Sequence, residues 1–175
     1  MKRDVRAARS AAGAAAGELT DLACACATAR QVARVLTHLY DSRLRGTGVE
    51  AAQFALMMTL DKEGPSSQAA LGRRYAIDKT TISRNLKLLE RNGWIEALAT
   101  RDTRERQFAL TAAGRKRLAA AKPEWKKAQA ELRSWMTPKE WDGMWCAFKT
   151  VTGAAQAVKR HGDRRRRSYR RVDMT

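Results

Sequence analysis

The segment DKTTISRNLKLLERNGWIE, residues 78–96, combines two helical stripes of opposite character. Ile82, Leu86 and Leu89 recur at i, i+4 and i+7, the spacing of a helix face that packs on a core. A second stripe, the polar stripe, carries hydroxyls and cations and no acid: Thr80, Ser83, Arg84, Lys87 and Arg91. Solvated helix faces usually mix both signs of charge, so the polar stripe predicts an anionic partner. The alternative is a soluble face with no partner.

Helical patterns also precede this segment. An amphipathic run covers about residues 20–44 and stops at RGTG, and a second helix covers about residues 50–62 and ends at EGP. Ser67 predicts the N-cap of a short helix that ends near residue 75. Asp78 then caps the helix with the polar stripe, and Gly93 predicts a left-handed end to it.

The pattern changes after Gly93. The segments WIEALAT and RQFALT are short and rich in strand-forming residues, and the charged turn RDTRE separates them, so they predict a β-hairpin. Thr111 predicts the cap of the next helix. Pro123 removes a helical hydrogen bond, so we expect a bend near Lys122, with the helix resuming through residues 125–135.

The last helix starts at a capping box. In TPKE, Thr137 stands at the N-cap, Pro138 at the first helical position and Glu140 at the third. Its apolar stripe comprises Trp141, Met144, Trp145, Phe148, Val151, Ala155 and Val158. The low-complexity basic residues 159–175 and the Ala-rich basic residues 1–19 predict disordered arms.

Charge sets this chain apart from an ordinary globular protein. Its 175 residues include 35 Lys and Arg against 18 acids, a net charge of +17. Residues 159–175 account for +6 of this, which leaves +11 on the rest of the chain. Such an excess favours nucleic acid or an anionic membrane surface as partner. The length allows one domain, or two small ones that share a core.

Several classes of protein are disfavoured. No apolar stretch is long enough for a membrane span, and the N-terminus lacks the hydrophobic core of a secretion signal. Three cysteines without framework spacing fit a reducing cytoplasm, where we expect the protein. No catalytic or nucleotide-binding motif is present, so we expect neither an enzyme nor a cofactor. C-x-C with only His38 at a distance is an incomplete metal-ligand set.

The central block resembles the MarR family of bacterial transcriptional regulators. LLERNGWIE (88–96) and RDTRERQFALTAAG (101–114) carry the resemblance, the latter with the family's D-x-R and L-T-x-x-G wing signature. The resemblance covers about residues 20–158 and implies a mainly α fold with a small β-hairpin wing, a winged helix-turn-helix plus a helical dimerisation region. The expected organisation is an arm (1–19), a dimerisation helix (20–48), the DNA-binding domain (49–111), C-terminal dimerisation helices (112–158) and a basic tail (159–175).

The resemblance also implies an obligate homodimer on double-stranded DNA. The apolar stripe of the last helix supports the dimer independently, because it is large for a terminal helix to leave exposed; the alternative is packing within one chain. The implied DNA-binding residues are Ser67, Gln68, Thr80, Thr81, Ser83, Arg84, Lys87, Arg91, Arg101, Asp102, Arg104 and Arg106.

Individual roles follow from side-chain chemistry and from the family. We expect Arg84 to read a base directly, and Lys87 and Arg91 to meet phosphate. In the wing, Arg104 is similar to the family's minor-groove arginine, which Asp102 would orient by an ion pair. Asp102 is alternatively a simple turn residue.

Two kinds of switch are open. Members of the family commonly release DNA when a small ligand, often an aromatic acid, binds, and the candidate pocket residues are His38, Tyr40, Arg43, Phe54, Met57, Met58 and Trp125. These residues are alternatively plain core. Oxidation of Cys24, Cys26 or Cys146 is the second route; Cys24 and Cys26 would point to opposite sides of one helix and could not pair with each other. Buried, inert thiols are the alternative.

The sequence therefore predicts a dimeric, sequence-specific transcriptional regulator, a repressor released from a pseudo-palindromic operator by a small aromatic ligand or by cysteine oxidation. The alternative is a non-specific architectural nucleic-acid-binding protein driven by its basic arms. The tail is also a candidate for anionic lipid, although it lacks the hydrophobic face that stabilises insertion.

Overall fold

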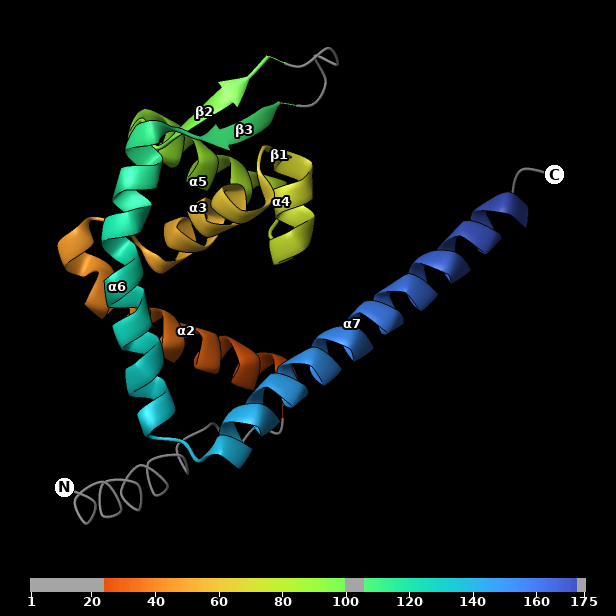
Figure 1. Ribbon diagram of the computed structural model, residues 1–175. Coiled ribbons are helices and arrows are strands. Elements are labelled where there is room, and N and C mark those ends of the chain that lie inside the picture. Colours follow the sequence, from red (N-terminus) through yellow and green to blue (C-terminus); the bar gives the residue numbers. More distant parts are fainter. Residues whose placement is uncertain (1–23, 100–105, 173–175) are drawn as a thin grey trace. The chain divides into compact units, whose positions relative to one another are not determined.

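A computed structural model describes residues 24–99 and 106–172 (Figure 1). The chain divides into two compact units, Met1–Ala130 and Glu131–Thr175. The elements, in chain order, are α2 (Ala25–Leu44), the short 3-10 helix η2 (Arg45–Thr47), α3 (Ala51–Glu63), β1 (Ser66–Ser67), α4 (Gln68–Tyr75), α5 (Lys79–Arg91), β2 (Ile95–Leu98), β3 (Gln107–Leu110), α6 (Ala112–Ser134) and α7 (Pro138–Val172). The expected arm 1–19 lies outside the described residues.

The short helix α4, the helix α5 and the hairpin β2–β3 form a winged helix-turn-helix, as the sequence predicts. β2 and β3 pair antiparallel, with Ile95 opposite Leu110 and Ala97 opposite Phe108. A third strand, β1, adds Ser67 opposite Gln107 on the other edge of β3, which gives the order β1–β3–β2 (Figure 1). The sequence does not predict β1, because two residues are too short to carry a strand pattern.

The α5 stripe predicted to face the core does so. Ile82, Leu86 and Leu89 are buried to 1% exposure or less. They belong to one cluster with residues of α3, α4, both hairpin strands and α6, including Met57, Leu71, Ile95, Phe108 and Leu118. Burial of this cluster on one side of α5 leaves the opposite side of the helix as surface.

The end of α5 sets the start of the hairpin. Gly93 has a left-handed φ of 69°. Its N–H donates to the Glu90 carbonyl oxygen at 2.9 Å, and the Trp94 N–H donates to the Leu89 carbonyl oxygen at 3.0 Å. This pair of bonds is the Schellman arrangement, which satisfies carbonyls that the helix end would leave free. The left-handed end predicted at Gly93 is therefore confirmed.

A close backbone approach joins α6 to the hairpin. The Thr111 hydroxyl accepts the Gly114 N–H at 3.0 Å, which confirms Thr111 as the cap, and donates to the Gly93 carbonyl oxygen at 2.7 Å. The Thr111 N–H donates to the Trp94 carbonyl oxygen at 3.0 Å. A Cβ on Gly114 would overlap that oxygen and lie 2.8 Å from the Trp94 carbonyl carbon. The glycine of the L-T-x-x-G signature is therefore needed for helix–strand contact.

One expectation about the C-terminal helices is confirmed and another is wrong. α6 runs from Ala112 to Ser134 with Pro123 inside it, so the helix extends past the proline as predicted, and the bend expected near Lys122 stays a prediction. The helix packs on both sides of the proline, where Ala121 is fully buried and the Trp125 ring stacks on Phe54, so tertiary contacts offset the missing hydrogen bond. α7 runs to Val172, so residues 159–172 are helical rather than disordered. Arginine and lysine are strong helix formers, and this segment contains no proline.

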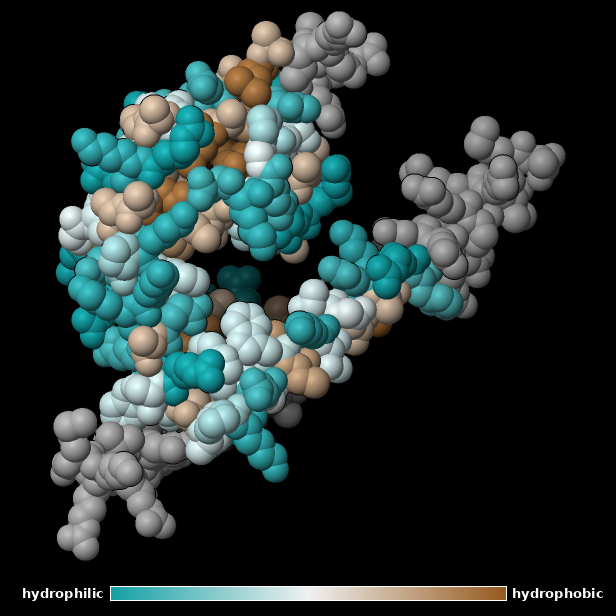
Figure 2. Space-filling view, viewed as in Figure 1, coloured by the Kyte–Doolittle hydropathy of each residue, from teal (hydrophilic) through white to brown (hydrophobic). Residues whose placement is uncertain are grey.

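The second unit contains α7, whose N-terminal cap is the predicted box. The Thr137 N–H donates to Glu140 Oε2 at 2.6 Å, and the Glu140 N–H donates to Thr137 Oγ1 at 3.2 Å. Along α7 the aromatic stripe consists of Trp141, Trp145 and Phe148, whose neighbouring rings meet edge to face at centroid distances of 6.0 and 6.1 Å. Figure 2 shows tan and white surface among the teal along the part of α7 that is coloured.

Candidate nucleic-acid interface

The polar stripe of α5 lies on the surface opposite the buried stripe. Thr80, Arg84, Lys87 and Arg91 are exposed and Ser83 is half-buried. Thr81, next to the stripe, is also exposed. The stripe therefore presents hydroxyls and cations to solvent along the length of one helix, which is the arrangement that contacts to an anionic polymer require.

Asp78 fixes the beginning of this helix. Its Oδ1 accepts the N–H groups of Thr80 and Thr81, both at 2.9 Å, and its Oδ2 accepts the Thr81 hydroxyl at 2.6 Å. The Thr81 hydroxyl, followed by the Thr81 N–H, lowers the pKa of the Asp78 carboxyl below its ordinary value. The hydroxyl proton of Thr81 is thereby used within the chain, whereas its oxygen stays available as an acceptor.

The Asp78 cap predicts a pH dependence of stability. Because the folded-state pKa is lowered, the charged carboxylate stabilises the fold above the ordinary carboxyl pKa of about 3.9, and this contribution is lost as pH falls through the folded-state value. Asp78→Asn keeps a good capping side chain that does not titrate. We expect the melting temperature of the native chain to exceed that of Asp78→Asn at pH 6 and the difference to narrow at pH 3, measured by circular dichroism. A difference independent of pH would contradict this role.

The preceding helix α4 begins beside the start of α5. The Ser67 hydroxyl accepts the Ala70 N–H at 3.2 Å and Ser67 is buried, so its predicted capping role is confirmed. Gln68 Nε2 donates to the Lys79 carbonyl oxygen at 3.4 Å, a bond that ties the two helix starts together. Lys79 itself is exposed at the first turn of α5 and was not among the predicted residues.

The single acid of α5 is paired. Glu90 lies on α5 close to the angular position of Ser83, and its Oε1 is 3.1 Å from Arg106 Nη2 at the start of β3. The Arg106 guanidinium also covers the Phe108 ring at 5.5 Å from its centroid. Arg106, one of the implied DNA-binding residues, thus has partners within the chain. Its pairing neutralises Glu90, the single acid of α5, so no acid of this helix is left to oppose the cations of the stripe.

Three predicted wing residues, Arg101, Asp102 and Arg104, lie outside the described residues, and so does the ion pair expected between the last two.

A cavity of about 270 Å³ is lined by residues of α2, α3, α4 and α6. Tyr40, Phe54, Met58 and Trp125, all predicted as pocket residues, line it. His38 and Arg43 do not line it, and Met57 is fully buried in the core. The residues that the sequence missed are Ala51, Ala55, Thr59, Lys62, Glu63, Arg74 and Tyr75. Five of these have polar or charged side chains. They form no helical stripe in the sequence, so the sequence pattern did not identify them.

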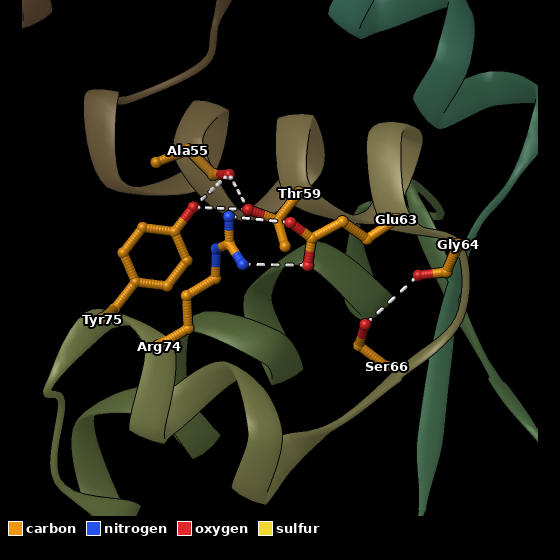
Figure 3. Close-up of polar contacts among 7 residues, drawn as sticks. All are labelled: Ala55, Thr59, Glu63, Gly64, Ser66, Arg74 and Tyr75. Carbon is orange, nitrogen blue, oxygen red and sulfur yellow. Dashed lines mark hydrogen bonds and ion pairs between the residues drawn. The ribbon is translucent and has the colours of Figure 1, made fainter.

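One wall of the cavity is a polar connection between α3 and α4 (Figure 3). The Tyr75 hydroxyl donates to the Ala55 carbonyl oxygen at 2.8 Å and lies 2.6 Å from Thr59 Oγ1. Arg74 pairs with Glu63 through two contacts, Nη2 to Oε1 at 2.7 Å and Nη1 to Oε2 at 3.0 Å. These bonds attach the end of α4 to the second half of α3.

Comparison with known proteins agrees with this geometry. A model of the MarR family matches residues 47–105. The transcriptional regulator MosR of Mycobacterium tuberculosis, solved in complex with DNA, is 32% identical, and the match covers 77% of this chain and 98% of MosR with a TM-score of 0.70. This chain belongs to the MarR family.

Two relatives of lower sequence identity are also transcriptional regulators. An uncharacterised HTH-type transcriptional regulator of Bacillus subtilis, YwoH, is 26% identical over 102 residues, which are 58% of this chain and 74% of YwoH. MarR of Escherichia coli, solved as a mutant with operator DNA, is 22% identical and shares the fold, with a TM-score of 0.65 over 70% of this chain and 89% of MarR. The chain therefore has the DNA-binding fold of MarR-family transcriptional regulators.

The cysteines of this MarR-family chain are free thiols. Cys24 is half-buried at the N-cap of α2 with an extended backbone, and Cys26 is exposed in the first turn. Cys24 is therefore not inside the helix, and the predicted placement of the two side chains on opposite sides of one helix does not apply to it. Cys146 is exposed on α7.

The described residues contain neither a metal-ligand cluster nor a membrane-spanning helix. Within residues 24–99 and 106–172 there is no group of three or more His, Cys, Asp or Glu that could hold a metal ion. No helix in these ranges has the length and hydrophobicity to cross a membrane.

Proposed function

We propose that this protein is a homodimeric, sequence-specific transcriptional repressor that binds a pseudo-palindromic operator in double-stranded DNA. The observation that carries the proposal is the exposed polar stripe of α5, whose neighbouring acid Glu90 is neutralised by Arg106. A two-fold dimer would place two such helices in successive major grooves, so the half-sites should lie about one helical turn apart, roughly 34–36 Å. The similarity to MosR, which was crystallised with DNA, supports this use of the fold.

Within this proposal the side chains of α4 and α5 take three roles. Arg84 reads a base, because its guanidinium can pair with guanine O6 and N7 in the major groove. Lys87 and Arg91 lie further along the helix and bind phosphate, which sets register without reading sequence. Gln68 and the backbone N–H groups at the start of α4 also meet phosphate. Thr80 and Ser83 contribute hydroxyls between these positions.

The wing adds the remaining proposed contacts. Arg104 enters the minor groove, oriented by Asp102, and Arg101 adds a phosphate contact. Arg106 positions the wing: its bond to Glu90 and its contact with Phe108 hold the start of β3 against α5.

Exposed apolar surface supports the dimer. Phe148 and Trp145 on α7 are 40% and 44% exposed, and Val35 on α2 is 63% exposed. Leu44 is the only described residue of α2 that is buried, although that helix carries a predicted apolar stripe. Apolar faces of this size on two helices are typical of surfaces that a second copy covers.

Release from DNA is proposed to follow either from a small aromatic molecule in the cavity lined by Phe54 and Trp125, or from oxidation of a cysteine. The candidates for oxidation are Cys26 and Cys146, which are exposed, and Cys24, which is half-buried and therefore less accessible.

The central experiment is fluorescence anisotropy with a duplex from immediately upstream of the protein's own gene, compared with a scrambled duplex at fixed salt. The protein is tested reduced and after mild peroxide treatment. A preference for the native duplex supports the proposal, and a preference lost on oxidation and restored by thiol would assign the switch to a cysteine. Duplexes tiled across neighbouring promoters extend the search. Equal, strongly salt-dependent binding to every duplex would contradict sequence specificity.

The second candidate function is non-specific binding through the basic C-terminal residues. Residues 159–175 carry a net charge of +6. A chain ending at residue 158 distinguishes the two functions: a specific regulator keeps its preferred duplex and loses affinity, whereas a non-specific binder loses nearly all binding and shows no preference.

Arg84→Ala is expected to weaken operator binding by about 1–3 kcal/mol and to relax specificity at one base pair, because a bidentate base contact is removed. The matched variant Lys87→Ala, on the same face of α5, should weaken all duplexes similarly and lower the salt slope by about 1. Both are measured by anisotropy against duplexes carrying single base-pair changes. A uniform loss for Arg84→Ala would show that Arg84 does not read a base.

A further inference from the structure

The attachment of α2 to α3 lies at the end of α2. Of the described residues of α2, only Leu44 belongs to the core cluster, and none of the partly buried apolar residues packed against that cluster comes from α2. The connecting residues 45–50, called here the α2–α3 joint, include the buried Val49. The direction of α2 relative to α3 and the winged helix-turn-helix therefore depends largely on contacts at this joint.

Asp41, in the last turn of α2, binds the first residue of α3. Its Oδ1 accepts the Ala51 N–H at 2.7 Å. An N–H in the first turn of a helix has no acceptor within that helix, so this bond satisfies a group that α3 itself leaves free. A carboxylate is favourable at the N-terminus of a helix and unfavourable in the last turn of its own helix. Asp41 therefore stabilises the start of α3 and the joint, and not α2 itself.

Arg117 of α6 makes a second contact with the joint. Its Nη1 donates to the Thr47 carbonyl oxygen at 2.8 Å, and its guanidinium lies 5.4 Å from the centroid of the Trp94 ring. A planar guanidinium can donate from its edge while its face covers a ring, which the compact ammonium of lysine cannot do. Trp94 is buried and lies between the end of α5 and the start of β2. One side chain therefore connects the joint to the segment that joins α5 to the hairpin.

The direction of α2 matters for a dimer on DNA. In the proposed dimer the two copies of α2 belong to the shared helical region, and each copy of α5 enters a separate half-site. The α2–α3 joint lies between these parts of the chain, so its angle affects the separation of the two α5 helices. One added base pair moves a half-site by about 3.4 Å along the duplex and turns it by roughly 35° around the axis. A joint held at one angle therefore accepts one spacing, whereas a slack joint accepts several.

We propose that Asp41 and Arg117 are positioning residues that hold the α2–α3 joint at one angle and thereby determine the half-site spacing that the dimer accepts. This inference rests on the proposed function and adds a determinant of operator specificity that requires no contact between these two residues and DNA. Base reading by Arg84 selects the sequence of each half-site, and the joint selects the number of base pairs between the half-sites. The two kinds of specificity are separable by mutation, because they depend on different residues.

The joint is tested without DNA by double electron–electron resonance, on a chain whose three cysteines are replaced by serine and which carries a spin label at Lys87→Cys on the exposed side of α5. The two labels of a dimer report the distance between its α5 helices. We expect Asp41→Ala and Arg117→Ala each to widen that distance distribution about 2-fold or more, because a joint with fewer contacts samples more angles. Asp41→Asn keeps an acceptor oxygen and should keep the native width. The control Ser42→Ala removes only a bond to the Leu39 carbonyl oxygen within α2 and should also keep it. An unchanged width in Asp41→Ala or Arg117→Ala would overturn the role of that residue.

The spacing is tested by anisotropy on the preferred duplex and on versions with one base pair added or removed between the half-sites. We expect the native chain to prefer the original spacing about 10-fold or more, and Asp41→Ala and Arg117→Ala to prefer it less than about 3-fold. Arg84→Ala should weaken binding to all three duplexes and keep the native preference for spacing. The preference is a ratio of affinities measured on one preparation, so a loss of folded protein lowers both affinities alike and leaves the ratio unchanged.

The outcomes separate this inference from the proposed function. A native-like preference for spacing in both alanine variants would overturn the inference and leave the proposed function standing. A native chain that prefers no duplex would contradict the proposed function and the selection of spacing, and the resonance widths would still decide whether the two residues hold the joint. A native chain without a dipolar signal between labels would be monomeric, and both would fail.

Discussion

Gly114→Ala is expected to destabilise the fold by about 3 kcal/mol, at the upper end of what overpacking costs. The added methyl would overlap the Trp94 carbonyl oxygen and lie 2.9 Å from Leu110 Cδ1. Neither contacting group can move away without losing an interaction. The Trp94 carbonyl oxygen accepts the Thr111 N–H at 3.0 Å, and Leu110 is buried in the core. The start of α6 would have to move away from the hairpin, which breaks the Thr111 contacts on both sides.

The measurement is thermal unfolding followed by circular dichroism, and we expect the melting temperature to fall by about 10 °C. Gly143→Ala is the matched control, because Gly143 lies within α7 and a Cβ there meets no atom within 4 Å. That substitution should leave stability unchanged or raise it by about 0.5–1 kcal/mol, since alanine is the better helix former. Equal melting temperatures for Gly114→Ala and the native chain would show that α6 and the hairpin do not approach this closely.

Trp145→Ala is expected to raise the dimer dissociation constant by about 30-fold or more. Trp145 stands in the middle of the aromatic stripe of α7, in edge-to-face contact with both Trp141 and Phe148, and 44% of it is exposed. Buried tryptophans at the centre of an interface commonly contribute about 2 kcal/mol or more, which corresponds to that change in affinity. Because the proposed operator requires both protomers, DNA binding at low protein concentration should fall as well.

Sedimentation equilibrium measures the dissociation constant directly. Phe148→Ala should weaken the dimer in the same direction, whereas Thr150→Ala, an exposed position about 140° away around the helix, should leave it unchanged. Circular dichroism at the same concentrations separates loss of association from loss of helix. A native chain that is monomeric, or a Trp145→Ala chain with an unchanged dissociation constant, would contradict the proposed dimer surface.

Much of the winged helix-turn-helix follows from local sequence. The buried stripe of Ile82, Leu86 and Leu89 has helical spacing, and the caps at Ser67 and Asp78 use side chains whose hydrogen bonds close within three residues. Such features depend on neighbours in the chain, so the sequence alone predicts them. The left-handed end at Gly93 belongs to the same group, because glycine adopts a positive φ without strain.

The aspects that the sequence did not predict depend on residues far apart in the chain. The pairing of Arg106 with Glu90 joins positions 16 residues apart, and the attachment of Tyr75 to Ala55 joins positions 20 residues apart. By itself, the sequence determined the helices, their caps, the hairpin and the polar stripe, because those are set by periodicity and by single side chains. Only the tertiary structure decided which polar groups meet, because a hydrogen bond or ion pair requires two atoms within about 3 Å, and the packing of the core sets that distance.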